Sequence, residues 1–300
     1  MSKLDPRLYA YRADLAAAGL RGRVEADRFV EGEPAQLCRG VANLHRRPAA
    51  GAPVDTQLLF GEPVTLYERA GGWAWVQSRQ DGYVGYVEAA ALGAVFAQPN
   101  HSVAVLRSHV FPKPDLKVPP LDALPMTSAV QVTDREGRFS RIAFGSDGSG
   151  WVFSAHLAPA GSVAPDYTAT ARQFLGVPYL WGGKTSEGLD CSGLIQVALA
   201  RAGVACPRDT DLQAAGLGKE IAPGLEGGLE GGLEGHRPAY GDILYMPGHV
   251  AIALDESRVV HANAHHMLVA IEPLADLLAR VAAECGRPAE QVITSVRRPA

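Results

Sequence analysis

The stretch that most constrains this chain is a glycine-rich loop that leads directly into Asp190-Cys191-Ser192-Gly193. The residues that follow, 192–201, have the apolar spacing of a helix. Cys191 is therefore expected at a helix N-terminus, where unpaired backbone N–H groups and the helix dipole favour a thiolate. A thiolate is the attacking species in cysteine catalysis. A cysteine in an apolar helix is also commonly a small buried hydrophobe, so position alone leaves both interpretations open.

A nucleophilic cysteine needs a base, and two histidines lie on strand-like segments after it. His249 begins one apolar run and His261 lies in the next, twelve positions later. Adjacent antiparallel strands would bring these side chains together, so that His261 orients the ring of His249. His265 and His266 could form a metal site with His261. Because adjacent strand residues point to opposite faces, we predict no metal.

The first half of the chain has a two-residue periodicity instead. Short β-rich runs punctuated by Gly and Pro over 35–95 predict a small barrel. A weak internal repeat continues beyond it: Val64 precedes Val130 by 66 positions, and Gly85 precedes Gly150 by 65. We therefore predict two copies of one barrel fold.

These patterns divide the chain into four parts. They are an N-terminal extension, two barrels and a cysteine-bearing domain, at 1–34, 35–95, 96–160 and 161–300. In the last part, a helix with the cysteine followed by several antiparallel strands predicts an α+β layer arrangement. The extension has a helix-like patch at 10–19. The Leu-Glu-Gly-Gly repeat at 224–235 has the composition of a mobile surface insertion, and we assign it no chemistry.

Composition argues against several functional classes. A net charge of −4 gives no excess of positive charge that would bind nucleic acid. The first residues lack an apolar signal core, and no apolar run approaches the ~20 residues needed to span a membrane, so we expect a cytoplasmic protein. The 4 cysteines lie far apart, in a pattern typical of neither a zinc ribbon nor a disulfide framework. We expect free thiols and no cofactor.

Six motifs follow one another in the second half of the chain. They are Tyr179-Leu-Trp-Gly-Gly, Asp190-Cys-Ser-Gly-Leu, Pro207-Arg-Asp-Thr, Gly241-Asp-Ile-Leu, Gly248-His-Val-Ala-Ile and Val260-His. In this order, over most of 165–297, they resemble the NlpC-type papain-like cysteine peptidases. The resemblance implies a papain-like catalytic domain, with its cysteine helix packed on an antiparallel sheet.

The same resemblance implies hydrolysis of the bond between γ-D-glutamate and a diamino acid in murein peptides. Cys191 matches the nucleophile, His249 the base and His261 the third polar residue. The hydroxyl of Tyr179 matches a group that supports the oxyanion beside the backbone N–H of Cys191. The matching substrate-contacting positions are Asp190 and Ser192.

The first barrel carries Trp-x-x-Val and Gly-Tyr-Val patterns that resemble bacterial SH3-like domains. In peptidases that combine such domains with an Arg-Asp-Ser or Arg-Asp-Ala motif, an aspartate and a tyrosine hold the free amine of an N-terminal L-alanine. The matching positions are Asp209, with Thr210 replacing the small residue, and Tyr83, and Glu62 is a further acidic candidate. A buried ammonium needs such a carboxylate. We therefore expect an endopeptidase that recycles short murein peptides.

Two other functions stay open. An N-acetylmuramoyl-L-alanine amidase or a hydrolase of intact peptidoglycan on the same fold would need an open site for the sugar. A wall-binding protein with an inactive catalytic domain would lack a reactive thiol. Asp209 could also be the N-cap of the next helix, and Tyr83 could simply pack in the barrel. The sequence specifies neither the diamino acid, diaminopimelate or lysine, nor the oligomeric state.

Overall fold

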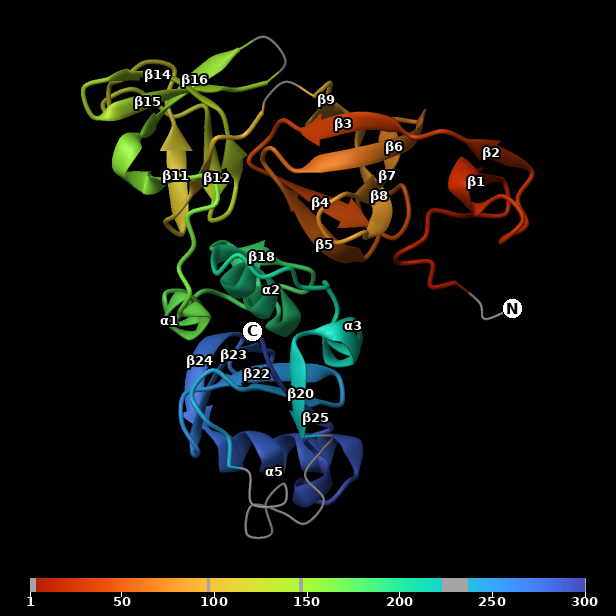
Figure 1. Cartoon of the computed structure of the whole chain (residues 1–300), viewed down its shortest axis with the longest axis vertical. Helices are drawn as coiled ribbons and strands as arrows, with labels where there is room; N and C mark the ends of the chain where they lie inside the picture. The colour runs from red at the N-terminus through yellow and green to blue at the C-terminus, as the bar shows by residue number, and fades with distance from the viewer. Residues whose placement is uncertain (1–3, 96–97, 146–147, 223–236, 300) are drawn as a thin grey trace. The chain divides into compact units, whose positions relative to one another are not determined.

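The computed structural model describes residues 4–95, 98–145, 148–222 and 237–299. The chain divides into two compact units, Met1–Ser162 and Val163–Ala300, and Figure 1 labels their elements. No helix in these described ranges is long and apolar enough to cross a membrane. The Leu-Glu-Gly-Gly repeat at 224–235 lies outside the described residues, so its assignment as a surface insertion stays a prediction.

The N-terminal segment forms a short strand pair, and the helix expected at 10–19 is wrong. Its elements are β1 (Leu15–Ala17), η1 (Ala18–Leu20) and β2 (Arg28–Val30). The strands β1 and β2 pair in parallel. Leu15 is wholly buried in one apolar cluster with Trp75 and Val84 of the following barrel. This tertiary packing outweighs the helix propensity of the alanines.

An antiparallel sheet of seven strands follows, with the spatial order β5-β4-β8-β7-β6-β3-β9. The elements are β3 (Glu33–Leu37), β4 (Val41–His45), β5 (Val54–Leu59), β6 (Pro63–Ala70), β7 (Trp73–Ser78), β8 (Val84–Glu88), η2 (Ala89–Ala91) and β9 (Leu92–Gly93). A Cβ on Gly85 would lie 2.7 Å from Cγ of Leu44 and 3.0 Å from the carbonyl oxygen of His45. The glycine of the Gly-Tyr-Val pattern is therefore required for close strand packing.

A similar succession of short elements occupies 101–159. They are β10 (His101–Val103), β11 (Arg107–Val110), β12 (Asp122–Pro125), β13 (Ala129–Val130), β14 (Val132–Glu136), β15 (Phe139–Ala143), β16 (Ser149–Phe153), η3 (Ser154–His156) and β17 (Leu157–Pro159). The run β15-β16-η3-β17 repeats the order of β7-β8-η2-β9. Gly150, which the internal repeat aligns with Gly85, also has no room for a Cβ, because that atom would lie 2.2 Å from Cγ1 of Val110.

The second unit is an α+β layer structure, as predicted. Its helices and first short strands are α1 (Tyr167–Arg172), β18 (Lys184–Thr185), β19 (Gly188–Leu189), α2 (Cys191–Arg201), α3 (Thr210–Gly216), α5 (Leu274–Cys285) and η4 (Ala289–Gln291). The main sheet contains β20 (Lys219–Ala222), β21 (Ile243–Met246), β22 (His249–Ala253), β23 (Arg258–Asn263), β24 (Leu268–Pro273) and β25 (Ser295–Arg298). This sheet is antiparallel, in the order β20-β25-β21-β22-β23-β24.

The sheet of the second unit lies between α2 and α5 (Figure 1). One buried cluster joins Leu277, Leu278 and Val281 of α5 to Ala251 and Val259 of the sheet. The helix α2 packs against β22 and β23. The helix that carries the cysteine is thus held directly on the two strands that carry the candidate histidines.

Candidate active site

Cys191 is the first residue of α2, and the turn before it depends on glycines. Asp190 caps the helix: its Oδ1 accepts from the N–H of Gly193 at 2.7 Å, and its Oδ2 accepts from the N–H of Gly182 at 2.8 Å. A Cβ on Gly193 would lie 2.2 Å from the carbonyl oxygen of Gly183, so only glycine fits. The loop and the helix start therefore form one rigid turn, with Cys191 at the helix N-terminus as predicted.

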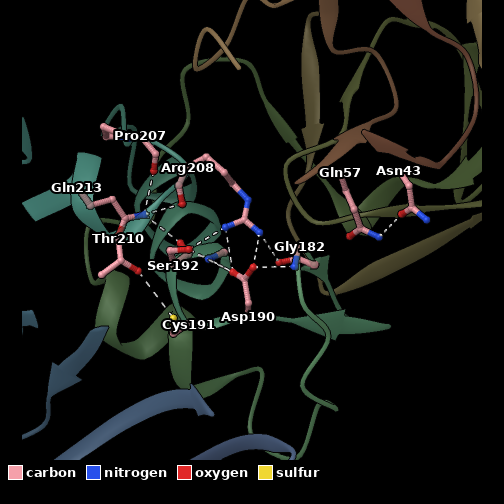
Figure 2. Close-up of polar contacts among 12 residues, drawn as sticks. Asn43, Gln57, Gly182, Asp190, Cys191, Ser192, Pro207, Arg208, Thr210 and Gln213 are labelled. Atoms are coloured by element: carbon pink, nitrogen blue, oxygen red, sulfur yellow. Dashed lines mark hydrogen bonds and ion pairs between the residues drawn. The ribbon is translucent and has the colours of Figure 1, made fainter. Parts of the chain in front are cut away.

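A buried arginine holds this turn together (Figure 2). Arg208 pairs with Asp190 through two bonds, Nη2 to Oδ2 at 2.6 Å and Nη1 to Oδ1 at 2.9 Å. Its Nη1 also donates to Oγ of Ser192 at 2.8 Å. The planar guanidinium suits this two-point geometry. Asp190 and Ser192 therefore serve the internal network, and their predicted substrate contacts stay predictions. Sequence reasoning misses Arg208, whose only signal is its place inside the Pro-Arg-Asp-Thr motif.

Burial governs the state of the Cys191 thiol. It raises the pKa of Cys191 to about 11, and the carboxylate of Asp190 adds to the rise. Hydrogen bonds from Thr210 and from the backbone N–H groups of Val250 and Ser192 act in the opposite direction. The expectation that the helix N-terminus favours the thiolate does not hold in the structure without substrate, because lost hydration dominates. The thiol is protonated at rest and needs a base.

The helix α3 begins beside this thiol. Thr210, its first residue, places its hydroxyl oxygen 3.9 Å from Sγ of Cys191 (Figure 2). Asp209 occupies the N-cap position, but its carboxylate makes no capping hydrogen bond to α3. The alternative in which the Asp209 side chain caps the helix is therefore not what the structure shows. Binding of a substrate amine by Asp209 and Thr210 stays a prediction.

His249 and His261 meet, as expected from their strands. Nε2 of His249 in β22 lies 2.7 Å from Nδ1 of His261 in β23. Burial lowers the pKa of each imidazole to about 3. The positive charge of Arg280 lowers both pKa values further, and the ring of His261 also lowers the pKa of His249. Both rings are therefore neutral at pH 7. The thiol of Cys191 interacts with the backbone N–H of Val250, the residue after His249, so Cys191 lies close to the strand that carries His249.

Tyr179 lies near the same thiol. Burial raises the pKa of this phenol, and the neighbouring Cys191 and Asp190 raise it further. The backbone of Tyr179 is fixed by a bridge to Leu189 and by donation of its N–H to the carbonyl oxygen of Met267 at 2.9 Å. The hydroxyl therefore stays protonated and can donate a hydrogen bond. Its role at the oxyanion stays a prediction.

Sequence reasoning also misses the groups on the second nitrogen of His261. Its Nε2 lies 2.7 Å from Oε1 of Glu272 and 3.1 Å from Nδ2 of Asn263. His261, Glu272 and the exposed His266 each offer a possible metal-ligand atom, all within 4.8 Å of one another. Glu272, however, already forms an ion pair with Arg280. The absence of a metal stays a prediction.

The two site residues predicted from the first barrel lie in the unit Met1–Ser162. Tyr83 is 3% exposed and packs in the barrel core with Leu44 and Val87, as the packing alternative expects. Glu62 is 6% exposed and lies between β5 and β6. Contact of Tyr83 or Glu62 with a substrate stays a prediction.

Comparison with known protein families gives two matches. Residues 176–278 match a family model described as NlpC/P60 family. Residues 44–92 match one described as bacterial dipeptidyl-peptidase Sh3 domain. The first match contains Cys191, His249 and His261, and the second contains most of the seven-stranded sheet.

Individual relatives are similar over much of the chain. Dipeptidyl-peptidase 6 of Lysinibacillus sphaericus is 26% identical over 242 residues, which are 74% of this chain and 85% of that protein. Gamma-D-glutamyl-L-lysine dipeptidyl-peptidase of Bacillus subtilis (strain 168) is 29% identical over 177 residues, 54% of this chain and 57% of that protein. The crystal structure of an NlpC/P60 family protein from Bacillus cereus ATCC 10987 matches with a TM-score of 0.69 and 18% identity, covering 89% of this chain and 99% of that chain. This last likeness shows the fold alone.

Proposed function

Since the chain is a cysteine peptidase with an NlpC/P60 domain behind a bacterial SH3 domain, we propose that it cleaves the γ-D-glutamyl–diamino acid bond of murein peptides with a free N-terminal L-alanine. The observation that carries the proposal is the hydrogen-bonded pair of His249 and His261 beside a cysteine at a helix N-terminus. The printed name of the Bacillus subtilis relative, a gamma-D-glutamyl-L-lysine dipeptidyl-peptidase, supports the bond assignment.

In the proposed reaction, His249 is the base. Its Nε2 is engaged by His261, which leaves Nδ1 to take the proton of the Cys191 thiol as Sγ attacks the γ-D-glutamyl carbonyl carbon. Collapse of the tetrahedral intermediate breaks the C–N bond, and the proton on Nδ1 passes to the leaving amine. Water then attacks the thioester while His249 accepts its proton. The second collapse releases L-Ala-γ-D-Glu and restores the thiol.

The negative charge that develops on the carbonyl oxygen needs donors. The backbone N–H of Cys191, at the start of α2, and the hydroxyl of Tyr179 fit this role. The raised pKa of Tyr179 supports it, because a protonated phenol can donate throughout the neutral range. Asp190 acts on the same step indirectly, because it holds the first turn of α2 with Arg208. Direct substrate contacts by Asp190 and Ser192 would come in addition.

Selection of a free amine is the finer part of the proposal. We assign recognition of the L-alanine ammonium to Asp209 and Thr210, with Tyr83 and Glu62 of the first unit. The position of Asp209 supports this, because it directly precedes Thr210, whose hydroxyl oxygen lies 3.9 Å from Sγ of Cys191. A carboxylate there would favour short free peptides over intact stem peptides, whose L-alanine is amidated. This selection would make the protein a cytoplasmic recycling enzyme.

We further propose that 96–160 is a second SH3-like module. The repeated order of β15-β16-η3-β17 after β7-β8-η2-β9 supports this. So do the aligned glycines Gly85 and Gly150, neither of which has room for a side chain. The proposal includes the predicted domain boundaries, 1–34, 35–95, 96–160 and 161–300.

The deciding experiment compares L-Ala-γ-D-Glu-diaminopimelate and its lysine analogue with their N-acetylated forms. Cys191→Ala is the blank, and Cys285→Ala is the matched control, because Cys285 is a free cysteine of the same unit that lies on α5. We expect cleavage of the free-amine peptides only. Equal cleavage of the acetylated peptides would point to intact peptidoglycan and contradict amine selection. A muramoyl peptide is tested beside them, and cleavage only of its muramoyl–L-alanine bond would favour an amidase. No Cys191-dependent cleavage of any substrate would favour the wall-binding alternative.

A further inference from the structure

A buried carboxylate and an arginine stand behind the histidine pair. Glu272 of β24 is 7% exposed, and its Oε1 lies 2.7 Å from Nε2 of His261. Arg280 of α5 pairs with both oxygens of this carboxylate and donates from Nη1 to Oε2 at 3.2 Å. The chain of contacts therefore runs from His249 through His261 to Glu272 and Arg280.

The strand register explains how Glu272 reaches this position. In the antiparallel pair of β23 and β24, His261 lies opposite Ala270. Glu272 is two positions further along β24, so it is on the same face and is a diagonal neighbour of His261. Diagonal neighbours are separated by about 7–8 Å, a gap that a glutamate and an imidazole together can span.

Two groups compete for Nε2 of His261, and they require opposite tautomers. A carboxylate can only accept, so Glu272 requires a proton on Nε2. The Nδ2 group of Asn263, 3.1 Å away, can only donate and requires a bare Nε2. Asn263 cannot turn its oxygen to His261 at no cost, because that oxygen accepts from the backbone N–H of His266 at 2.7 Å.

The distances and charges favour Glu272. Its oxygen is closer to Nε2 than the amide nitrogen is, 2.7 Å against 3.1 Å. A bare nitrogen facing a carboxylate at that distance would place two lone pairs against each other. Asn263 has another acceptor in the carbonyl oxygen of Leu268, at 3.4 Å. Arg280 keeps Glu272 in place with a two-point ion pair.

We propose that Glu272, held by Arg280, is a positioning residue that fixes the tautomers of both histidines. The proposal rests on the proposed function, in which His249 is the base. With its proton on Nε2, His261 presents a bare Nδ1 to His249. His249 must then carry its own proton on Nε2, which bonds to His261, and its Nδ1 is bare and ready for the thiol proton of Cys191. With the opposite tautomers, in which both rings carry the proton on Nδ1, His249 would present an N–H to the thiol.

Glu272 also balances charge when the base becomes an imidazolium. The two charged groups behind the histidine pair have opposite effects on the pKa of His249: Glu272 raises it and Arg280 lowers it. Loss of the carboxylate alone would leave Arg280 as the charge behind His261, and the protonated base would be destabilised. Changing Glu272 should therefore lower kcat and leave KM unchanged, because the residue does not touch the substrate.

The direct test is the tautomeric state of the histidines in the wild-type protein, read from ¹⁵N chemical shifts of labelled imidazoles, with and without EDTA. We expect Nε2–H on both His249 and His261. In Glu272→Gln, the new amide can donate a hydrogen bond to Nε2 of His261. We then expect the His261 proton to move from Nε2 to Nδ1, and kcat to fall about tenfold to a hundredfold. The matched control is Asp242→Asn. Asp242 is another buried carboxylate of this unit that pairs with an arginine, Arg298, at 2.6 Å.

The control variant should keep the wild-type tautomers and kcat, even if it lowers stability as much as Glu272→Gln does. The proposal is overturned if wild-type His261 carries its proton on Nδ1, or if EDTA changes the Nε2 signal as release of a metal would. It is also overturned if folded Glu272→Gln keeps the wild-type tautomers and kcat. A protein without Cys191-dependent peptidase activity would defeat the proposed function, while the wild-type tautomers would still decide this proposal.

Discussion

At the scale of single residues, the proposed nucleophile Cys191 and the proposed base His249 are both held in their neutral forms. The thiol of Cys191 has a pKa raised to about 11 by burial, and the imidazole of His249 has a pKa lowered to about 3, also by burial. A preformed thiolate–imidazolium pair is therefore not the resting state. In the proposed reaction, proton transfer from sulfur to nitrogen would then accompany attack on the substrate, as in general-base catalysis.

The alkylation of Cys191 by iodoacetamide should reveal this state. Only the thiolate reacts, and well below a pKa of about 11 its fraction grows about tenfold per pH unit. We expect the rate to rise steadily from pH 6 to pH 9, as followed by mass spectrometry of the peptide that contains Cys191. Cys191→Ala identifies that peptide, and Cys285 serves as an internal comparison. A rate that is already constant between pH 5 and pH 7 would show a preformed ion pair and contradict the neutral resting state.

At the scale of elements, the site is a property of strand pairing. The strands β22, β23 and β24 place His249, His261 and Glu272 beside one another, and the turn before α2 places Cys191 on the same sheet. Buried neutral imidazoles are part of that packing. They make the stability of the second unit sensitive to acid, because protons bind the histidines of the unfolded chain more readily than those of the folded one.

This sensitivity has a definite sign and pH window. The folded-state pKa of His249 and His261 is about 3, against the ordinary 6.5. Between these values the unfolded chain binds more protons, so stability is lost as the pH falls from about 6.5 toward 3, by up to about 1.4 kcal/mol per pH unit for each histidine. The slope should be smaller in His261→Gln and unchanged in His265→Gln, whose histidine is exposed. Hydrogen exchange of the β22 and β23 amides at several pH values measures the slope of stability against pH. Equal slopes in the wild type, His261→Gln and His265→Gln would contradict the expectation.

The sequence predicts the parts of the site that depend on local pattern. Cys191 and its helix follow from a glycine turn and apolar spacing, and the histidine pair follows from two neighbouring strands. The partners Arg208 and Glu272 could not be predicted in this way. Arg208 reaches Asp190 from 18 positions away, and the diagonal contact of Glu272 requires knowledge of the register. The expected thiolate failed for a related reason, since burial is a property of the folded structure.

At the scale of the whole molecule, the chain combines a papain-like unit with a β-rich unit whose sequence repeats. The α+β arrangement and the first barrel were predictable from periodicity. The helix expected at 10–19 was not correct, because Leu15 is buried against Trp75 and Val84, which lie 60 and 69 positions further along the chain. Local propensity cannot register such a contact. The internal repeat, by contrast, points to two glycines that prove to have the same steric constraint.

Replacement of either glycine should therefore destabilise the β-rich unit. In Gly85→Ala and Gly150→Ala the new Cβ would meet Leu44 at 2.7 Å and Val110 at 2.2 Å. We expect each change to cost about 1–3 kcal/mol, as overpacking does, measured by the thermal unfolding of the β-rich unit. Gly51→Ala is the matched control, because a Cβ there meets nothing within 4 Å. A stable Gly150→Ala protein would argue against a second copy of the barrel.

The protonated, buried thiol also determines how the enzyme responds to reactive small molecules. Peroxides and simple electrophiles attack thiolates, and the resting Cys191 offers very little thiolate at neutral pH. The enzyme should thus tolerate oxidative stress that inactivates cysteine enzymes with acidic thiols. A covalent inhibitor would have to occupy the peptide site first, so that His249 takes the proton from sulfur while the warhead is already in place. Affinity for the site, rather than intrinsic reactivity, would decide which compounds inactivate the enzyme.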